Sequence, residues 1–149
     1  MEQKIQKSFV DHGFGFPVIL MNVPMIRIRG KWTPNINYNK LTDAVLRALC
    51  AKPARLTGNE VKFIRQHFEM TLQAFSARFS VSHVAVIKWE KKGDNPTAMN
   101  WATEKDIRLF VLSRLTEKDK ALAELYRTLE QEKEARQKDI ELDAHTVAA

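Results

Sequence analysis

The chain has 149 residues, of which 44% are hydrophobic, and it carries 24 Lys or Arg against 18 Asp or Glu. This length allows one compact domain with an appendage. The single cysteine, Cys50, excludes an intramolecular disulfide and a multi-cysteine zinc site, and we expect it to be a small buried residue on a helix. No apolar run reaches the length of a membrane span and the N-terminus lacks the order of a secretion signal, so we expect a soluble cytoplasmic protein.

The net charge of +6 is unevenly distributed along the chain. Residues 1–56 hold nine Lys or Arg against three Asp or Glu, residues 57–115 hold nine against six, and residues 116–149 hold six against nine. A positive field over the first two segments suits a polyanion, because Lys and Arg neutralise phosphates. The charge supports a nucleic-acid partner when it accompanies a binding motif.

Residues 1–55 predict a small module that consists of a β-hairpin and a helix. Two apolar runs, 16–21 and 25–29, are separated by Asn22-Val23-Pro24, which predicts two strands joined by a turn. Three basic residues in and after the second run are either a solvated strand surface or a nucleic-acid contact: Arg27, Arg29 and Lys31. Apolar residues at helical spacing then predict a helix over 38–51, which ends before Lys52-Pro53.

No catalytic constellation is evident in the sequence. The dipeptide Asp11-His12 is followed by two glycines within three residues and predicts a loop. A Gly-rich phosphate loop, a Cys/His set at metal spacing and a carboxylate pair in an apolar setting are all missing. We therefore expect a protein that is not an enzyme and that binds neither a cofactor nor a metal.

Residues 56–115 predict a helical domain. Thr57 and Glu60 have the spacing of a capping box, and the helix that follows would have an inner stripe of Val61, Ile64 and Phe68. A turn rich in Gly and Pro follows residue 92, and the apolar spacing over 103–115 predicts a last helix.

The most informative stretch is residues 70–90, whose apolar spacing fits two short helices joined by a tight turn. Phe75 and Phe79 are four residues apart and Val86 and Trp89 are three apart, so each helix would present one apolar face. Thr71 and Ser82 would cap the two helices. Val81 would fill the corner between them, and the small Ser76 would lie where the helices cross. This pattern predicts a helix-turn-helix.

The same residues resemble the Xre or lambda-repressor/Cro family of DNA-binding domains. The resemblance covers about residues 56–115 and rests on Met70-Thr71, Val81-Ser82 and Trp89-Glu90. Two positions depart from the family. Leu72 stands where the family usually has Gln, with Gln73 beside it, and Ser80 stands where it usually has a Gly that permits a left-handed turn.

A second resemblance concerns Leu56-Thr57-Gly58 and Glu60, which are similar to the start of the Xre-like domain in two-part antitoxins of the MqsA (YgiT) type. The resemblance implies a toxin protein as a partner and regulation of the chain's own promoter. The Cys pairs of that family's zinc ribbon are absent, so the resemblance implies no zinc here.

A third helix over 83–91 would present one face to the DNA major groove. Lys88 is suited to guanine, Ser82 and His83 to a base or phosphate, and Val84 and Ile87 to a thymine methyl group. Val84 and Ile87 are otherwise core or dimer residues, and Lys91 and Lys92 otherwise serve only the helix dipole. The full set of predicted DNA-binding residues is Thr71, Gln73, Ser82, His83, Val84, Ile87, Lys88, Lys91, Lys92 and Asn95.

Residues 116–149 predict a charged helix as far as about Leu142, followed by a frayed end. One apolar stripe spans two or three turns: Leu122, Leu125, Tyr126 and Leu129. The stripe packs either on its own domain or on a second subunit, and we regard it as the preferred surface for a homodimer.

The sequence thus predicts a mainly α fold, a lambda-repressor-like helix-turn-helix bundle with a small N-terminal hairpin-helix module and a C-terminal helix. Its segments would be residues 1–55, 56–115 and 116–149. The predicted function is that of a sequence-specific regulator of transcription that binds double-stranded DNA as a homodimer, in one setting an autoregulating antitoxin. The alternative is a protein-protein adaptor that docks through the helix-turn-helix and the C-terminal helix.

Overall fold

The computed structural model of the chain describes residues 2–115, 120–129, 133 and 135–149. These residues form a mixed α/β fold with a four-stranded sheet, so the prediction of a mainly α fold was wrong. Two compact units are present, where the sequence predicted three consecutive segments. We call residues 1–45 with 139–149 the sheet unit, and residues 46–138 the helical unit. Among the described residues, no helix is long and apolar enough to cross a membrane.

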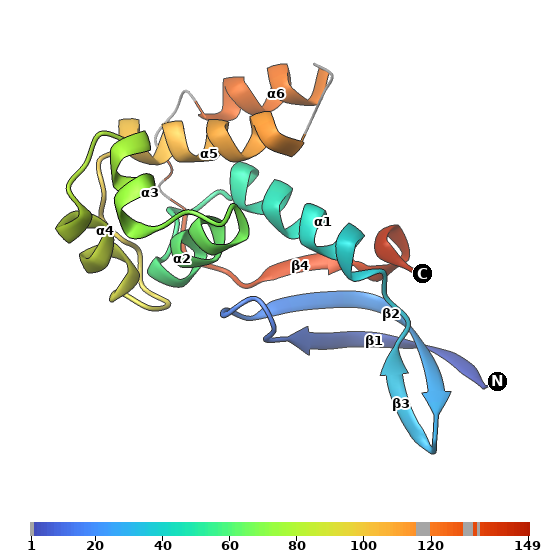
Figure 1. Cartoon of the computed structure of the whole chain (residues 1–149). Helices are drawn as coiled ribbons and strands as arrows, with labels where there is room; N and C mark the ends of the chain where they lie inside the picture. The colour runs from blue at the N-terminus through green and yellow to red at the C-terminus, as the bar shows by residue number, and fades with distance from the viewer. Residues whose placement is uncertain (1, 116–119, 130–132, 134) are drawn as a thin grey trace. The chain divides into compact units, whose positions relative to one another are not determined.

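The sheet unit is built around β2, the longest strand. The first strand pairs with β2 in antiparallel fashion along its length, the third pairs antiparallel with the end of β2, and the last pairs parallel with its start (Figure 1). The strands are β1 (Gln3–Asp11), β2 (Val18–Ile28), β3 (Lys31–Pro34) and β4 (Ile140–Asp143).

The predicted turn at Asn22-Val23-Pro24 does not exist, because β2 runs through these residues without interruption. Asn22 adopts a φ of +53°, a conformation that Asn tolerates better than most residues. The buried positions of β2 change there from even to odd numbers: Val18 and Leu20 before Asn22, Val23 and Met25 after it. Asn22 therefore changes which positions of β2 point inward, from even-numbered to odd-numbered residues, and the strand continues past it.

The turn of the hairpin lies seven residues beyond Asn22, at Arg29-Gly30 between β2 and β3. Both residues have positive φ, +52° and +77°, as a two-residue hairpin turn requires. Arg29 therefore lies in the turn and does not share a strand face with Arg27, which forms an exposed ion pair of 3.3 Å with Glu2.

The C-terminal residues belong to the sheet unit, so the prediction of a helix to Leu142 with a frayed end was wrong. After β4, a short 3₁₀ helix (Ala144–Val147) buries Ala144 and Val147. The amide of Asn37 donates to the carbonyl of Val147 over 2.9 Å, which fixes this end of the chain. β4 forms because β2 offers it a partner more than a hundred residues away in the sequence.

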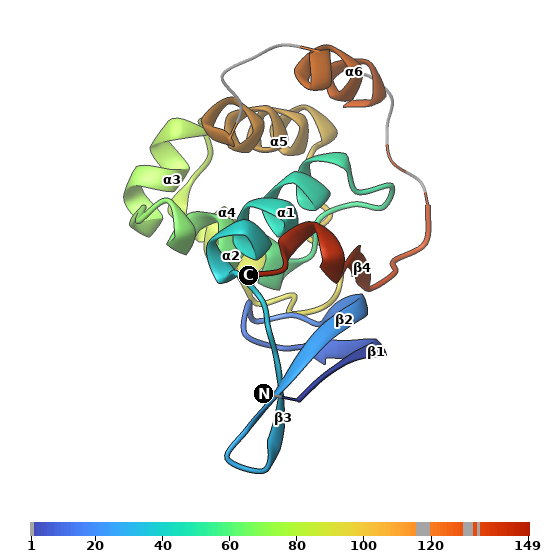
Figure 2. The same ribbon diagram turned by 90° about the vertical axis from the view of Figure 1, so that its right-hand side faces the viewer.

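The helix over residues 38–51 is confirmed as α1 (Tyr38–Ala51), which begins in the sheet unit and ends in the helical unit. The helical unit also contains α2 to α6, whose bounds are α2 (Gly58–His67), α3 (Leu72–Arg78), α4 (His83–Glu90), α5 (Trp101–Leu115) and α6 (Lys120–Leu129). α5 and α6 lie side by side in both views (Figures 1 and 2).

The apolar stripe predicted for the C-terminal helix lies on α6. Leu129 is fully buried and Leu125 is half-buried, whereas the side chains of Leu122 and Tyr126 lie outside the described residues. Leu129 packs within its own chain, so it is not available to a second subunit.

Candidate nucleic-acid interface

Residues 70–90 form two short helices, α3 and α4, that contact each other and are joined by the four residues 79–82. Both helices begin at the predicted caps. The hydroxyl oxygen of Thr71 accepts from the amide of Ala74 over 3.0 Å, and that of Ser82 accepts from the amide of Ala85 over 3.1 Å. Each cap satisfies a backbone donor that the first turn leaves without a partner.

The inward face of the pair consists of the residues predicted for it. Phe75 and Val86 are fully buried, Phe79 is 5% exposed and Trp89 is 9% exposed. The rings of Phe75 and Phe79 meet edge to face at 4.7 Å. Ser76 is buried, and its hydroxyl donates to the carbonyl of Gln73 over 2.9 Å. The register predicted for both helices is therefore confirmed.

The turn between α3 and α4 keeps a left-handed residue although it lacks glycine. Ser80 has a φ of +57°. The next amide, that of Val81, donates to the carbonyl of Ser76 over 3.0 Å, so the chain reverses tightly at the end of α3. A non-glycine residue in this region carries about 1–2 kcal/mol of backbone strain, which the packing of the two helices must offset.

Two contacts from α2 hold the C-terminal end of α4. A Cβ atom added at Gly58 would lie 2.2 Å from the carbonyl oxygen of Trp89, so only glycine allows this close approach. Arg65 donates to both carboxylate oxygens of Glu90 over 2.7 and 3.0 Å. These hydrogen bonds are the main cause that raises the pKa of Arg65 above its ordinary value. The position of α4 is therefore set by a backbone contact and a bidentate ion pair.

The opposite face of α4 is open to solvent. Ser82, His83 and Lys88 are exposed, Val84 is 49% exposed, and Ile87 is half-buried. These side chains lie on the far side of the helix from Val86 and Trp89. Val84 and Ile87 are thus not core residues of this chain, which removes one of the two alternative roles that the sequence left open for them.

The remaining predicted residues lie at the two ends of the helix pair. Thr71 and Gln73 are exposed at the start of α3. Lys91 and Lys92 are exposed immediately after α4. Asn95 is also exposed, but its side-chain amide donates to the carbonyl of Lys92 over 3.2 Å, which engages one of its hydrogens within the turn.

The net charge lies entirely in the unit that contains these helices. The sheet unit holds six Lys or Arg and six Asp or Glu, whereas the helical unit holds 18 against 12. Four of the six carboxylates in residues 46–115 form ion pairs within that segment: Glu60, Glu90, Glu104 and Asp106. Lys88, Lys91 and Lys92 form no ion pair with any described residue, so their charge is available to an anionic partner.

A second group of charges in the helical unit is buried, and the sequence did not reveal it. Arg108 and Glu104 are both fully buried, with 2.7 Å between a guanidinium nitrogen and a carboxylate oxygen. Arg108 also donates to the carbonyls of Lys52 and Ala54, each over 2.6 Å. Burial lowers the pKa of the Arg108 guanidinium from its ordinary value, against the opposing charge of Glu104.

This buried cluster fixes the segment of the chain between α1 and α2 against α5. Glu104 accepts from the amide of Leu56 over 3.2 Å and from Arg55 over 2.9 Å. Lys52 and Glu60 form a buried ion pair of 2.8 Å beside it. In the sequence, Glu104 and Arg108 have the spacing of an ordinary surface pair on a helix. The only hint of burial was the apolar composition of their neighbours.

Cys50 is buried as expected, and its thiol donates to the carbonyl of Arg108 over 3.3 Å. Burial raises the pKa of this thiol to about 12, so the nucleophilic thiolate is scarce at neutral pH. Among the residues that the structure describes, no group of three or more His, Cys, Asp or Glu could hold a metal ion.

Comparisons of the chain with protein-family models, with curated proteins and with solved structures gave no match.

Proposed function

We propose that this chain is a sequence-specific DNA-binding regulator of transcription whose α4 enters the major groove. The observation that carries the proposal is the exposed face of α4, which presents Lys88 together with Val84 and Ile87 while the opposite face is buried. An α-helix fits the major groove, where every base pair has a distinct pattern of donors, acceptors and methyl groups. The +6 charge of the helical unit supplies the attraction to phosphate.

The residues divide into two roles by their position. Lys88, Ser82 and His83 would reach base edges or the nearest phosphates, and Val84 and Ile87 would pack on thymine methyl groups. The residues at the ends of the helix pair would bind the phosphate backbone: Thr71, Gln73, Lys91, Lys92 and Asn95. Because the reading face lacks the bidentate amides of Asn and Gln, DNA shape would contribute more than usual to specificity.

The proposal includes two copies of the chain on one operator. A helix-turn-helix reads few base pairs, so specificity usually requires two half-sites about 34 Å apart. Light scattering of the full chain, alone and mixed with operator DNA, tests this part. A monomer under both conditions contradicts the dimer and leaves the reading face of α4 unaffected.

The recognition helix can be tested after an operator has been selected from a random duplex library with the full chain. Lys88→Ala should weaken binding by about 1–3 kcal/mol and relax the preference at one base pair. Lys92→Ala should weaken binding to operator and scrambled DNA alike. Lys40→Ala, which removes an exposed charge on α1, is the matched control and should leave affinity unchanged. Fluorescence anisotropy at one fixed salt concentration measures all three.

Two results would contradict this assignment. If Lys88→Ala and Lys92→Ala reduce the affinity for operator and for scrambled DNA by the same factor, α4 does not read bases. Selection that enriches no motif would show that the helix pair does not act on DNA, and would favour the alternative of a protein adaptor.

The narrower proposal of an autoregulating antitoxin rests on the resemblance at Leu56-Thr57-Gly58 and Glu60 alone. Co-expression with the product of the neighbouring gene tests it. A stable complex that changes operator affinity would support the proposal, and the absence of a complex would contradict it.

A further inference from the structure

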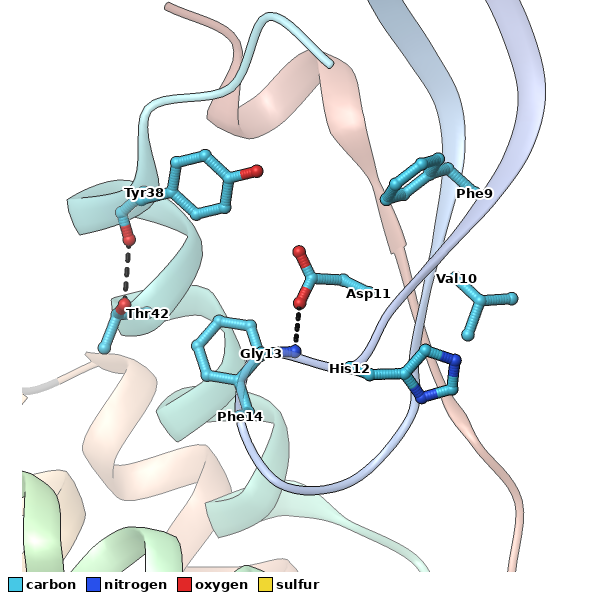
Figure 3. Close-up of a pocket in the computed structure, with 8 residues that line it drawn as sticks. All are labelled: Phe9, Val10, Asp11, His12, Gly13, Phe14, Tyr38 and Thr42. Carbon is cyan, nitrogen blue, oxygen red and sulfur yellow. Dashed lines mark hydrogen bonds between the residues drawn. The ribbon is translucent and has the colours of Figure 1, made fainter. Parts of the chain in front are cut away.

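A cavity of about 440 Å³ lies in the sheet unit, between the end of β1 with its following loop and the first turns of α1. It is independent of the helix pair proposed to bind DNA, because all its lining residues lie between Phe9 and Thr42. Cavities of this volume suit small organic ligands. The lining residues are drawn in Figure 3.

Aromatic rings and one carboxylate give this cavity its chemistry. Phe9, Phe14 and Tyr38 supply the rings, and the carboxylate of Asp11 extends toward the space between Tyr38 and Phe14 (Figure 3). Tyr38 is 53% exposed, so a large ring faces solvent at the wall of the cavity. The aromatic rings of Phe9, Phe14 and Tyr38 therefore surround the carboxylate of Asp11.

The carboxylate of Asp11 is oriented but not neutralised. Its Oδ1 accepts from the amide of Gly13 over 2.7 Å, and it forms no ion pair with any described residue. Among the residues that the structure describes, neither Lys nor Arg lines the cavity. Burial, and after it the charge of Asp11, raises the pKa of the Tyr38 hydroxyl above its ordinary value.

The other polar groups at the wall contribute little positive potential. The hydroxyl of Thr42 donates to the carbonyl of Tyr38 over 2.8 Å, so its hydrogen is occupied. The side chain of His12 points away from the space between Tyr38 and Phe14 (Figure 3). An anionic ligand would meet the charge of Asp11, and a neutral ligand would leave that charge without an opposite charge among the described residues.

We propose that this cavity binds a small organic cation that carries an ammonium group. The faces of aromatic rings attract such cations through their quadrupoles, and a carboxylate supplies the opposite charge. The source of the ammonium group is either a free metabolite-sized amine or the side chain of a methylated lysine in a peptide.

The test uses choline and its neutral isostere 3,3-dimethylbutan-1-ol as probes of the full chain. Their binding is measured from the chemical shifts of the Gly13 amide and the Tyr38 ring in NMR titrations. Choline should bind at least about tenfold more tightly than the isostere, because only the charge differs between them. N-acetyl-trimethyllysine amide is the second probe, and tighter binding of this compound than of choline would assign the site to a peptide side chain.

Two variants and one control complete the experiment. Asp11→Asn keeps the acceptor for the Gly13 amide and removes only the charge, and Tyr38→Leu removes a ring. Each should weaken choline binding about tenfold. Asp43→Asn removes an equal charge from α1 outside the cavity and should change nothing. Far-UV circular dichroism confirms that each variant is folded.

Equal affinity for choline and the isostere would overturn the proposal, as would unchanged choline binding by folded Asp11→Asn. Failure to bind either ammonium probe would also overturn it. None of these outcomes bears on DNA binding, which is measured with the helical unit's variants.

Discussion

Two groups of charged residues in the helical unit differ in burial and in pairing. Around Arg108, cations and carboxylates are buried and paired, and the guanidinium of Arg108 donates to two backbone carbonyls. On α4 and just after it, Lys88, Lys91 and Lys92 are exposed and form no ion pair with a described residue. Charge in the first group holds the chain together, whereas charge in the second remains available to a partner. Substitutions should therefore separate stability from binding.

The largest effect is expected for Arg108→Met. This change leaves the carboxylate of Glu104 buried and removes the donors to the carbonyls of Lys52 and Ala54. Breaking a buried pair in this way should reduce the free energy of unfolding by about 3–5 kcal/mol. Urea denaturation monitored by circular dichroism measures the loss.

The matched control is another arginine that pairs with an acid on α5. Arg78 and Asp106 are 3.2 Å apart, with side chains 43% and 47% exposed. Arg78→Met should change the free energy of unfolding by less than about 1 kcal/mol. Similar losses for both variants would remove the distinction between the buried and exposed groups.

Gly58→Ala should have the next largest effect. The added Cβ would lie 2.2 Å from the carbonyl oxygen of Trp89, and a backbone atom cannot move aside as a flexible side chain can. We expect a loss of about 1–3 kcal/mol, together with weaker DNA binding because the end of α4 must shift. Gln66→Ala, on the exposed face of α2, should remain within about 0.5 kcal/mol of the parent. Thermal denaturation and anisotropy distinguish the two variants.

Two serines in the segment that joins α3 and α4 should respond in opposite directions. Ser82→Ala removes the cap of α4 and should cost about 1 kcal/mol. Ser80→Gly relieves a φ of +57° and should raise the thermal midpoint by an amount that corresponds to at most about 1 kcal/mol. A lower midpoint for Ser80→Gly would show that its side chain, and not its backbone conformation, matters for the turn.

At pH 9.5, the smallest effect is expected from the ionisation of Cys50. Its pKa is raised from 9.0 to about 12 by burial, so the unfolded chain releases this proton first as the pH rises. The folded chain should therefore lose stability progressively between pH 9 and pH 12, with a contribution of about 0.8 kcal/mol at pH 9.5. Cys50→Ala should show a shallower decline over this range in urea denaturation. Identical slopes would contradict burial of the thiol.

Much of the helical unit could be predicted from the sequence, because its elements depend on residues three or four positions apart. Thr57, Thr71 and Ser82 were recognised as caps from their own neighbours, and the structure confirms all three. The inward faces of α3 and α4 followed from the spacing of Phe75, Phe79, Val86 and Trp89. The candidate reading face of α4 is the complement of that apolar face and was predictable for the same reason.

The sheet unit was poorly predicted, because its pairings join distant parts of the chain. β1 has mainly exposed side chains and no clear alternation, so its sequence lacks the pattern of a half-buried strand. β4 has a partner only when Ile140 lies beside Val18. Asn22 and Pro24 are typical of a turn, yet Asn22 takes a positive φ within a continuous strand.

By itself, the sequence determined the starts of α2, α3 and α4, the inward faces of α3 and α4, and the position of the turn between these two helices. Only the tertiary structure decided that the fold is mixed α/β, that Glu104 and Arg108 are buried, and that Gly58 touches the end of α4. The physical reason is the separation along the sequence between the residues that interact. Caps and apolar stripes depend on contacts within one or two helical turns, whereas strand pairing and burial of a charge depend on which distant segments exclude water together.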